Sequence, residues 1–233
     1  MIPAYNEEKM IVKTIKGVFK TNKKFDVLVI NDGSTDRTLA EVAKTKADVI
    51  SHPYNLGYGV ALQTGYKYAL ENGYDALVQI DADGQHDPKY IAKILKVLQS
   101  SRVDLVVGSR FKSGMKYKAP LARRLGMIFF NFIVNRATGL GMTDSTSGYQ
   151  AIKRIVLPFL VSEYFPCDYP DADLMIMLHF AGYRVKEMPM KMYESETGQS
   201  MHGSIIKNFY YVFKMSLSIF TVILRKYTGL PNK

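Results

Sequence analysis

The sequence predicts an α/β domain built on a mainly parallel sheet. Short apolar runs typical of buried strands alternate with segments of helical period through the first 110 residues or so. Several of these runs end in polar turns. With 233 residues the chain is long enough for one large domain with a sizeable core. In open parallel sheets, ligands bind beyond the carboxyl ends of the strands, so the polar strand ends are the first candidates for a site.

Periodicity and turn residues set the expected order of elements. In chain order the sequence predicts a helix at 9–19, a strand at 25–30, a helix to about 44, a strand at 47–51, a helix to about 71, a strand at 76–80, a helix at 90–98 and a strand at 103–107. Three polar strand ends, at 31–32, 81–83 and 109–110, are therefore expected to meet in one crevice.

The alternation fades after residue 111. Residues 120–140 contain a pair of arginines followed by an apolar run, and residues 144–150 are polar and typical of a loop. The sequence beyond them predicts a helix at 171–180, a strand at 184–192 and a flexible loop at 194–203.

The last long element covers residues 204–226 and is rich in apolar side chains. Its uninterrupted apolar run, 215–224, is ten residues, about half of what a membrane-spanning helix needs. Two interpretations stay open: an interfacial amphipathic helix with basic anchors, or a terminal helix packed on its own core. The expected division is a catalytic domain at 1–203 and a C-terminal amphipathic helix at 204–233 that docks on a membrane or a partner.

Composition narrows the function classes. The formal charge of +10 predicts anionic partners, such as nucleic acid, a phosphorylated substrate or an anionic membrane surface. Cys167 is the single cysteine, which excludes an internal disulfide and a multi-cysteine zinc site. The four histidines form no zinc-hydrolase pattern, and the sequence has neither a phosphate-binding P-loop nor a complete dinucleotide-binding glycine motif.

The stretch Asp81-Ala82-Asp83 places two carboxylates one residue apart at the end of an apolar strand. Two desolvated like charges are costly unless a cation or hydrogen-bond donors compensate them. Mg²⁺ or Mn²⁺ holding a diphosphate would do so, since these ions prefer oxygen ligands. A polar turn without a metal is the alternative.

Five motifs in order carry a family resemblance. They are Ile2-Pro3-Ala4-Tyr5-Asn6-Glu7-Glu8, Asn31-Asp32-Gly33-Ser34-Thr35-Asp36, Asn55-Leu56-Gly57, Asp81-Ala82-Asp83-Gly84-Gln85-His86 and Gly108-Ser109-Arg110. The set resembles family 2 glycosyltransferases of the GT-A fold, in particular the dolichyl- or polyprenyl-phosphate sugar transferases. The resemblance covers about residues 1–200 and implies a nucleotide-sugar donor, a divalent metal and inversion at the anomeric carbon.

The resemblance also implies roles for individual residues. Nucleotide binding is expected from Pro3, Ala4, Tyr5, Glu7, Asp32 and Asp81. Asp83 resembles the ligand of the metal and the diphosphate, with Asp81 and Gln85 assisting. A buried Tyr5 ring and a helix-start carboxylate at Glu7 are the non-functional alternatives.

On the acceptor side, family members that use lipid phosphates hold the phosphate with arginines, because guanidinium donors form a planar fork. Arg110 matches directly, and Arg123 or Arg124 is the expected second arginine, with a solvated basic helix face as the alternative. The later family loop often reads Arg-x-x-Gly-x-Ser-Lys. Here Ser200 matches, but Met201 replaces the lysine, and His202 is the candidate substitute.

Asp171 and Asp173 occupy a place where related enzymes carry acidic pairs that serve as general base. A sugar hydroxyl needs such a base, whereas a phosphate monoester is already largely ionised near neutral pH. With a phosphate acceptor Asp171 would be orienting; with a hydroxyl acceptor it would be the base. The expected catalytic residues are Asp83, Arg110 and Asp171.

The expected function is transfer of a sugar, most simply from a UDP-sugar, to polyprenyl phosphate at the cytoplasmic membrane face, for cell-surface polysaccharide or glycoconjugate synthesis. The expected partners are an anionic membrane surface and, as in some relatives, a small integral membrane protein, with no nucleic acid. A hydroxyl acceptor on a lipid-linked saccharide and a noncatalytic basic scaffold are the alternatives. The strand entering Pro3 is central in this fold, yet Met1 and Ile2 alone precede Pro3, so residues appended upstream should add stability.

Overall fold

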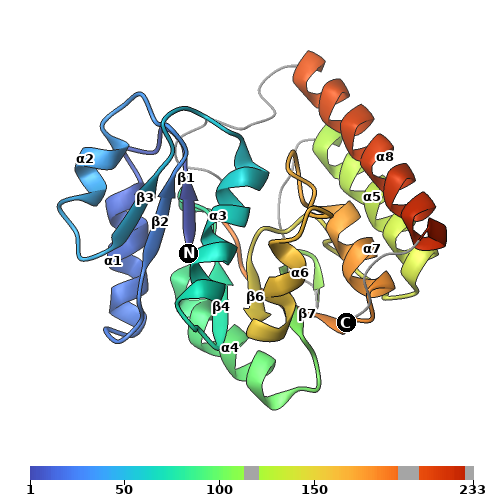
Figure 1. Ribbon diagram of the computed structural model, residues 1–233, viewed down its shortest axis with the longest axis horizontal. Coiled ribbons are helices and arrows are strands. Elements are labelled where there is room, and N and C mark those ends of the chain that lie inside the picture. Colours follow the sequence, from blue (N-terminus) through green and yellow to red (C-terminus); the bar gives the residue numbers. More distant parts are fainter. Residues whose placement is uncertain (113–120, 194–204, 229–233) are drawn as a thin grey trace.

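The computed structural model describes residues 1–112, 121–193 and 205–228, and its strands form a two-part sheet, of three and four strands, joined by hydrogen bonds at Met1 (Figure 1). One part is parallel and consists of β1 (Ile2–Ala4), β2 (Leu28–Asn31) and β3 (Asp48–Ser51). The other has the order β4-β6-β5-β7 and consists of β4 (Ala76–Gln79), β5 (Leu105–Ser109), β6 (Gln150–Lys153) and β7 (Val185–Pro189). Among the described strands β6 runs antiparallel to both of its neighbours, β4 and β5, and the other pairings are parallel. The predicted α/β class with a mainly parallel sheet is confirmed.

The two parts of the sheet meet at Met1. Its backbone nitrogen donates to the Val78 carbonyl (2.9 Å), and the Ile80 N–H donates to the Met1 carbonyl (3.2 Å). These bonds place β1 beside β4, so the turn after β4 lies next to the loop after β1.

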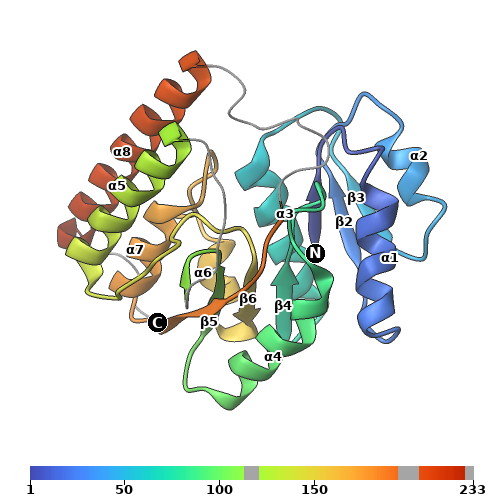
Figure 2. The same cartoon turned by 180° about the vertical axis from the view of Figure 1, so that it is seen from behind.

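Helices cover both faces of the sheet (Figures 1 and 2). The core on one face includes α1 (Ile11–Thr21) and α4 (Ile91–Ser100), and the core on the other includes α3 (Tyr58–Glu71), α6 (Leu157–Leu160) and α7 (Ala172–Phe180). Strand β5 shows the alternation directly, since Leu105 and Val107 point into one core and Val106 into the other. The short α2 (Thr38–Val42) packs against α1 and β2.

Two long helices lie outside α7. They are α5 (Leu121–Thr138) and α8 (Ile205–Thr228), which run side by side in both ribbon views (Figures 1 and 2). Because both pack on α7, every α7 residue from Ala172 to Leu178 is buried. None of the helices in the described part of the chain is long and apolar enough to cross a membrane.

The sequence located most elements within a few residues. The helix predicted to end near residue 71 is α3, and the long element predicted at 204–226 is the helix α8. Strand β6 was not predicted, because its four residues contain too few apolar positions to reveal a period and one of the buried ones is a glutamine. The predicted loop at 194–203, with Ser200 and His202, lies outside the described residues.

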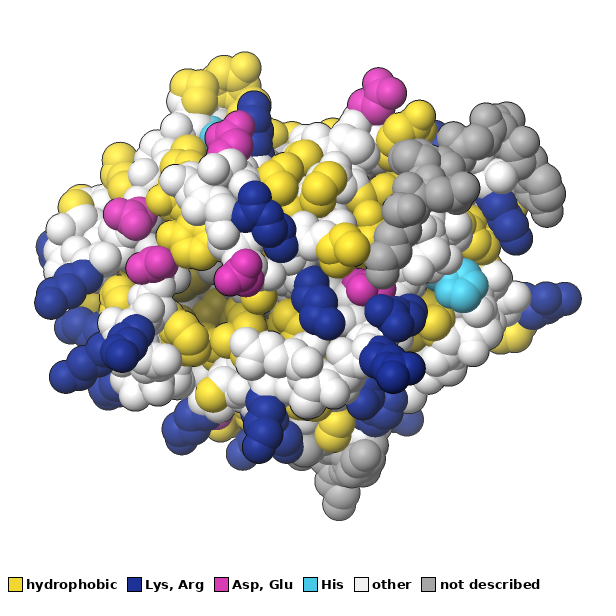
Figure 3. Space-filling view, turned by 60° about the horizontal axis from the view of Figure 1, so that its bottom comes forward, with side chains coloured by type: hydrophobic (Ala, Val, Ile, Leu, Met, Phe, Trp, Pro, Cys, Tyr) yellow, Lys and Arg dark blue, Asp and Glu magenta, His cyan; other side chains and the backbone are white. Residues whose placement is uncertain are grey.

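A cavity of about 250 Å³ lies between β2 and β4 and is lined by Met1, Leu28, Leu77 and other mostly apolar residues. A hollow floored by hydrophobic side chains is visible on the lower face of the molecule (Figure 3). The unfilled space costs stability because its lining lacks packing partners.

Appending four β-forming residues ahead of Met1 should therefore raise the melting temperature by several degrees, since an extended β1 would fill the cavity and pair with both neighbours. Thermal denaturation followed by circular dichroism measures the change. A four-residue Gly-Ser extension is the control, and an equal effect of both extensions would contradict the expectation.

Candidate active site

The turn after β4 holds Asp81 and Asp83 in a fixed arrangement. The Asp81 N–H donates to His86 Nδ1 (2.9 Å), and His86 is buried with its ring 5.0 Å from that of Tyr149. Gly84 turns the chain with φ +80°, a conformation that L side chains rarely adopt. Asp83 accepts hydrogen bonds from the Gln85 N–H (3.0 Å) and from Gln85 Nε2 (2.7 Å). Gln85 thus orients Asp83, as an assisting residue would.

A chain of hydrogen bonds orients Asp81. Its Oδ1 accepts from the Tyr58 hydroxyl (3.1 Å), which accepts from Gln79 Nε2 (3.2 Å), and Gln79 Oε1 accepts from the Tyr66 hydroxyl (2.6 Å). Gly148 lies against the carboxylate, and a Cβ there would sit 3.2–3.3 Å from both Asp81 oxygens. The sequence did not point to Tyr58 or Gly148, because neither belongs to a motif that ends a strand.

Glu7 brings a third carboxylate toward the two aspartates. Its Oε2 is buried and has no hydrogen-bond partner among the described residues. Burial, followed by the nearby charges of Asp83 and Asp81, raises the pKa of Glu7 to about 7. Burial, then the charge of Asp81, likewise raises the pKa of Asp83. This site therefore has an excess of negative charge.

A divalent cation fits this excess, because it would offset the repulsion and give the carboxylate oxygens a partner. Within the described residues no three or more Asp, Glu, His or Cys side chains are grouped as a ready-made metal site. A cation held by Asp81 and Asp83 would take its remaining ligands from a bound phosphate group or from water, which is common for Mg²⁺.

The first loop and the turn after β2 are tied together. Asn6 adopts φ 56° and its Oδ1 accepts from the Thr35 N–H (2.8 Å), while the Glu7 N–H donates to Thr38 Oγ1 (2.8 Å). Pro3 and Ala4 are buried in β1, whereas the Tyr5 side chain is 45% exposed and so is not the buried ring of the alternative interpretation.

Asp32 is buried at the end of β2, where its carboxylate accepts three hydrogen bonds. They come from His52 Nδ1 (2.7 Å), the Leu56 N–H (2.9 Å) and the Gly57 N–H (2.9 Å). The His52 bond depends on the ring tautomer, but the two amide bonds fix the loop ahead of α3. Asp32 therefore shapes the crevice through this loop.

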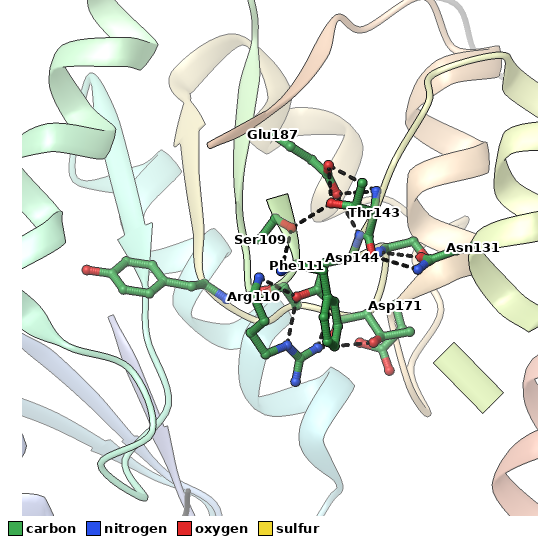
Figure 4. A network of polar contacts seen from close by, with 12 residues as sticks. Ser109, Arg110, Phe111, Asn131, Thr143, Asp144, Asp171 and Glu187 are labelled. Carbon is green, nitrogen blue, oxygen red and sulfur yellow. Dashed lines mark hydrogen bonds and ion pairs between the residues drawn. The ribbon is translucent and has the colours of Figure 1, made fainter. Parts of the chain in front are cut away.

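Arg110, at the end of β5, forms a buried ion pair (Figure 4). Its Nε and Nη2 donate to the two oxygens of Asp144 at 2.7 and 2.6 Å, and Asp144 is fully buried. Glu187 in turn accepts from the Thr143 N–H (2.9 Å) and the Asp144 N–H (2.7 Å). The Arg110 side chain is 5% exposed and its planar fork holds a carboxylate, so in this arrangement its first partner is Asp144, and its predicted role as a phosphate ligand stays a prediction.

Asp171 precedes α7 and is half-buried, close to the Arg110–Asp144 pair (Figure 4). Burial, followed by the charges of Asp173 and Asp81, raises the pKa of Asp171 to about 7. The Tyr211 hydroxyl, from α8, donates to Asp171 Oδ2 (2.8 Å). Arg124 is exposed on α5, while the side chain of Arg123 lies outside the description.

Comparison with known proteins identifies the family. The model of "Glycosyl transferase family 2" matches residues 1–159, more than half of the chain. The chain belongs to glycosyl transferase family 2. This confirms the resemblance and makes the noncatalytic scaffold the weakest interpretation.

Three relatives align with this family 2 chain over most of both lengths. The UDP-N-acetylglucosamine–dolichyl-phosphate N-acetylglucosaminyltransferase of Methanococcus voltae is 31% identical, over 92% of this chain and 93% of its own. The undecaprenyl-phosphate mannosyltransferase of Micrococcus luteus is 32% identical, over 88% of each. The polyprenol monophosphomannose synthase of Mycolicibacterium smegmatis is 31% identical, over 89% and 82%.

A solved structure supports the fold. Glucosyl-3-phosphoglycerate synthase from Mycobacterium tuberculosis, in complex with Mn²⁺, UDP-glucose and phosphoglyceric acid, superposes with a TM-score of 0.70 at 19% identity. The superposition covers 100% of this chain and 79% of the other. The family 2 chain therefore has the GT-A fold that the motifs predicted.

Proposed function

We propose that this family 2 chain transfers a sugar from a UDP-sugar to a polyprenyl phosphate, with inversion and with Mg²⁺ or Mn²⁺, at the cytoplasmic face of the membrane. The observation that carries the proposal is the set of three relatives, one named for N-acetylglucosamine and two for mannose, which are all named for a polyprenyl-type acceptor. The sugar would be a hexose or an N-acetylhexosamine, since the relatives include both. The product would serve cell-surface polysaccharide or glycoconjugate synthesis.

The donor would bind across the carboxyl ends of β1, β2 and β4. Pro3, Ala4 and Tyr5 would border the nucleotide, with the half-exposed Tyr5 ring available for stacking. Asp32 would act through the loop that it holds. The Glu7, Asp81 and Asp83 carboxylates support a cation site, in which Asp81 and Asp83 would be the ligands and Gln85 would keep Asp83 oriented. When bound, the cation supplies positive charge that stabilises the departing diphosphate.

The acceptor side is expected near Asp171, Arg110 and α5. Arg124 is exposed and could approach a phosphate directly, whereas Arg110 is buried. The further candidates for contact with the phosphate come from the sequence alone and are Arg123, Ser200 and His202. A polyprenyl phosphate carries its own negative oxygen, so alignment and charge stabilisation would supply most of the catalysis.

The outer face of α5 and α8 supports binding to an anionic membrane surface. Its exposed apolar side chains are Leu125, Ile128, Phe129 and Phe132 on α5, and Tyr210, Phe213, Leu217, Phe220 and Leu224 on α8. The two helices contain seven Lys or Arg and no Asp or Glu. Apolar stripes with basic neighbours are typical of interfacial helices. The opposite side of α8 packs into the core through Met215, Ile219 and Val222, so the two interpretations of this helix are compatible.

A transfer assay tests the proposal. The purified chain is incubated with Mn²⁺, undecaprenyl or dolichyl phosphate, and radiolabelled UDP-glucose, UDP-N-acetylglucosamine or GDP-mannose in turn. The expected result is an organic-soluble product labelled from one UDP-sugar. Label from GDP-mannose alone would overturn the choice of UDP, and transfer only to a lipid-linked saccharide would overturn the phosphate acceptor.

A second candidate is a hydroxyl acceptor with Asp171 as general base. The observation in its favour is the raised pKa of Asp171, about 7, because a base works best with a pKa near the operating pH. Asp173, the other aspartate at the start of α7, has its pKa raised by burial to about 6 and is buried within the helix.

Asp171→Asn separates the two candidates. With a phosphate acceptor we expect the turnover to fall less than about tenfold, whereas loss of a general base lowers it by about 10²–10⁴-fold. Burial raises the pKa of Asp171, so folding favours the protonated form and wild-type stability falls as the pH rises from about 4 to about 7. The Asn variant should therefore melt above the wild type at pH 8 but not at pH 5. Melting curves at both values check that the variant is folded.

A further inference from the structure

One face of α8 contacts the segment that precedes and begins α7. Tyr211 donates to Asp171 (2.8 Å), Lys214 Nζ lies 2.7 Å from Asp168 Oδ2, and the Ser218 hydroxyl donates to Asp173. These three α8 residues are spaced three and four apart and so share one side of the helix. The outermost helix of the fold thus reaches three aspartates, one of which lies beside the candidate active site.

The three contacts differ in which carboxylate they reach, and the Tyr211 contact reaches the aspartate that faces that site. The Lys214–Asp168 pair is exposed and contributes little. Asp173 is buried within α7, where its other oxygen accepts from the Leu174 N–H (2.7 Å) and serves the helix start. Asp171 instead lies near Arg110 and Asp81, so its carboxylate orientation bears on the acceptor side.

The Tyr211 ring is held on two sides. It meets Phe130 of α5 edge to face at 5.9 Å between ring centroids, and Tyr169 at 5.1 Å. A ring held in this way gives the hydroxyl a fixed position. The hydrogen bond to Asp171 Oδ2 is therefore directed, and it depends on α8 staying in register on α5 and α7.

We propose that Tyr211 is a positioning residue that fixes the Asp171 carboxylate, and that α8 is through this contact a part of the acceptor side of the active site. The same helix carries the exposed apolar stripe, so a membrane bound on its outer face would hold Tyr211 against Asp171. This role of Tyr211 adds to the proposed function. The turnover test below rests on the proposed function, whereas the measurement of the Asp171 pKa does not.

The first test does not need a substrate. The Asp171 pKa is measured by carbon NMR of the side-chain carboxyl in protein labelled at aspartate, with Asp171→Asn to assign the signal. The groups that face Asp171 are Tyr211, Asp173, Arg110 and Asp81. Tyr211→Phe removes the donor that favours the charged carboxylate, so we expect the pKa to rise by about one unit. An unchanged pKa would overturn the proposal.

The matched control is Tyr74→Phe, which removes a tyrosine–aspartate hydrogen bond (3.1 Å, to Asp26) remote from this site. It should leave the Asp171 signal unchanged. Should Tyr211→Phe not fold, 3-fluorotyrosine at position 211 keeps the ring and strengthens the donor. The Asp171 pKa should then fall, and no change would count against the proposal.

The second test measures turnover with the lipid phosphate and donor that the transfer assay identifies. Tyr211→Phe should lower kcat by about threefold and leave the KM for the nucleotide sugar unchanged, because acceptor alignment is lost while the donor side is intact. Tyr74→Phe should change neither constant. If no lipid phosphate is a substrate, the proposed function fails but the NMR result still decides the role of Tyr211.

Discussion

Asp83→Asn is expected to reduce sugar transfer on the order of 10³-fold, the largest loss that we predict for a single side chain of this site. The amide keeps the size of the carboxylate and still accepts from the Gln85 N–H, so the turn should survive. What it removes is the negative charge that a divalent cation needs between Asp81 and the donor diphosphate.

Binding measurements show whether that loss is specific. In the wild type, UDP with Mn²⁺ at about 100 times its Kd should stabilise the fold by about 2.7 kcal/mol, seen as a rise in melting temperature. The Asp83→Asn variant should lose the part of this stabilisation that depends on Mn²⁺. Asp48→Asn, an exposed position on β3, is the control and should keep both activity and the Mn²⁺ effect. Normal transfer by Asp83→Asn would refute the cation site.

The donor side of the site could be predicted because its residues follow strands directly. The carboxyl ends of parallel strands meet at one edge of a sheet, so the sequence predicts that Asp32 and Asp81 lie in one crevice. Glu7 is predicted by the resemblance, and its buried Oε2 has no hydrogen-bond partner among the described residues. What these residues bind stays a prediction.

The acceptor side was harder to predict because its contacts join distant segments. Asp144 and Glu187 lie 34 and 43 or more residues from the groups they hold, and nothing in the local sequence marks them as partners. The motif predicts Arg110 as a phosphate ligand but not its ion pair with Asp144, because the local sequence around an arginine is the same whether it faces solvent or a buried carboxylate. Tyr211 could not be distinguished from the other aromatic residues of α8, since the pairing with Asp171 exists only once α8 packs on α7. The four-residue β6 was missed for a related reason, because its pairing with β4 and β5 rather than its sequence makes it a strand.

Asp144→Ala should lower the free energy of unfolding by about 3–5 kcal/mol, because it leaves the Arg110 guanidinium buried without its carboxylate partner. The change also frees the Arg110 N–H, which donates to Asp144 Oδ2 (2.9 Å). Urea denaturation at neutral pH measures the loss. Lys44→Ala, which breaks the exposed pair with Glu41 (2.6 Å), is the control and should cost less than about 1 kcal/mol.

Removing both partners separates the structural role of this pair from a catalytic one. Arg110→Met with Asp144→Leu should recover most of the stability lost in Asp144→Ala, because no buried charge is left unpaired. If the pair only braces the fold, the double variant should also recover transfer. We expect that the double variant does not recover transfer. Arg110 lies close enough to Asp171 to lower the pKa of that carboxyl, and the double variant removes this positive charge from the acceptor side. A stable double variant with full activity would reduce Arg110 to a structural residue and leave Arg124 as the described arginine best placed for the acceptor phosphate.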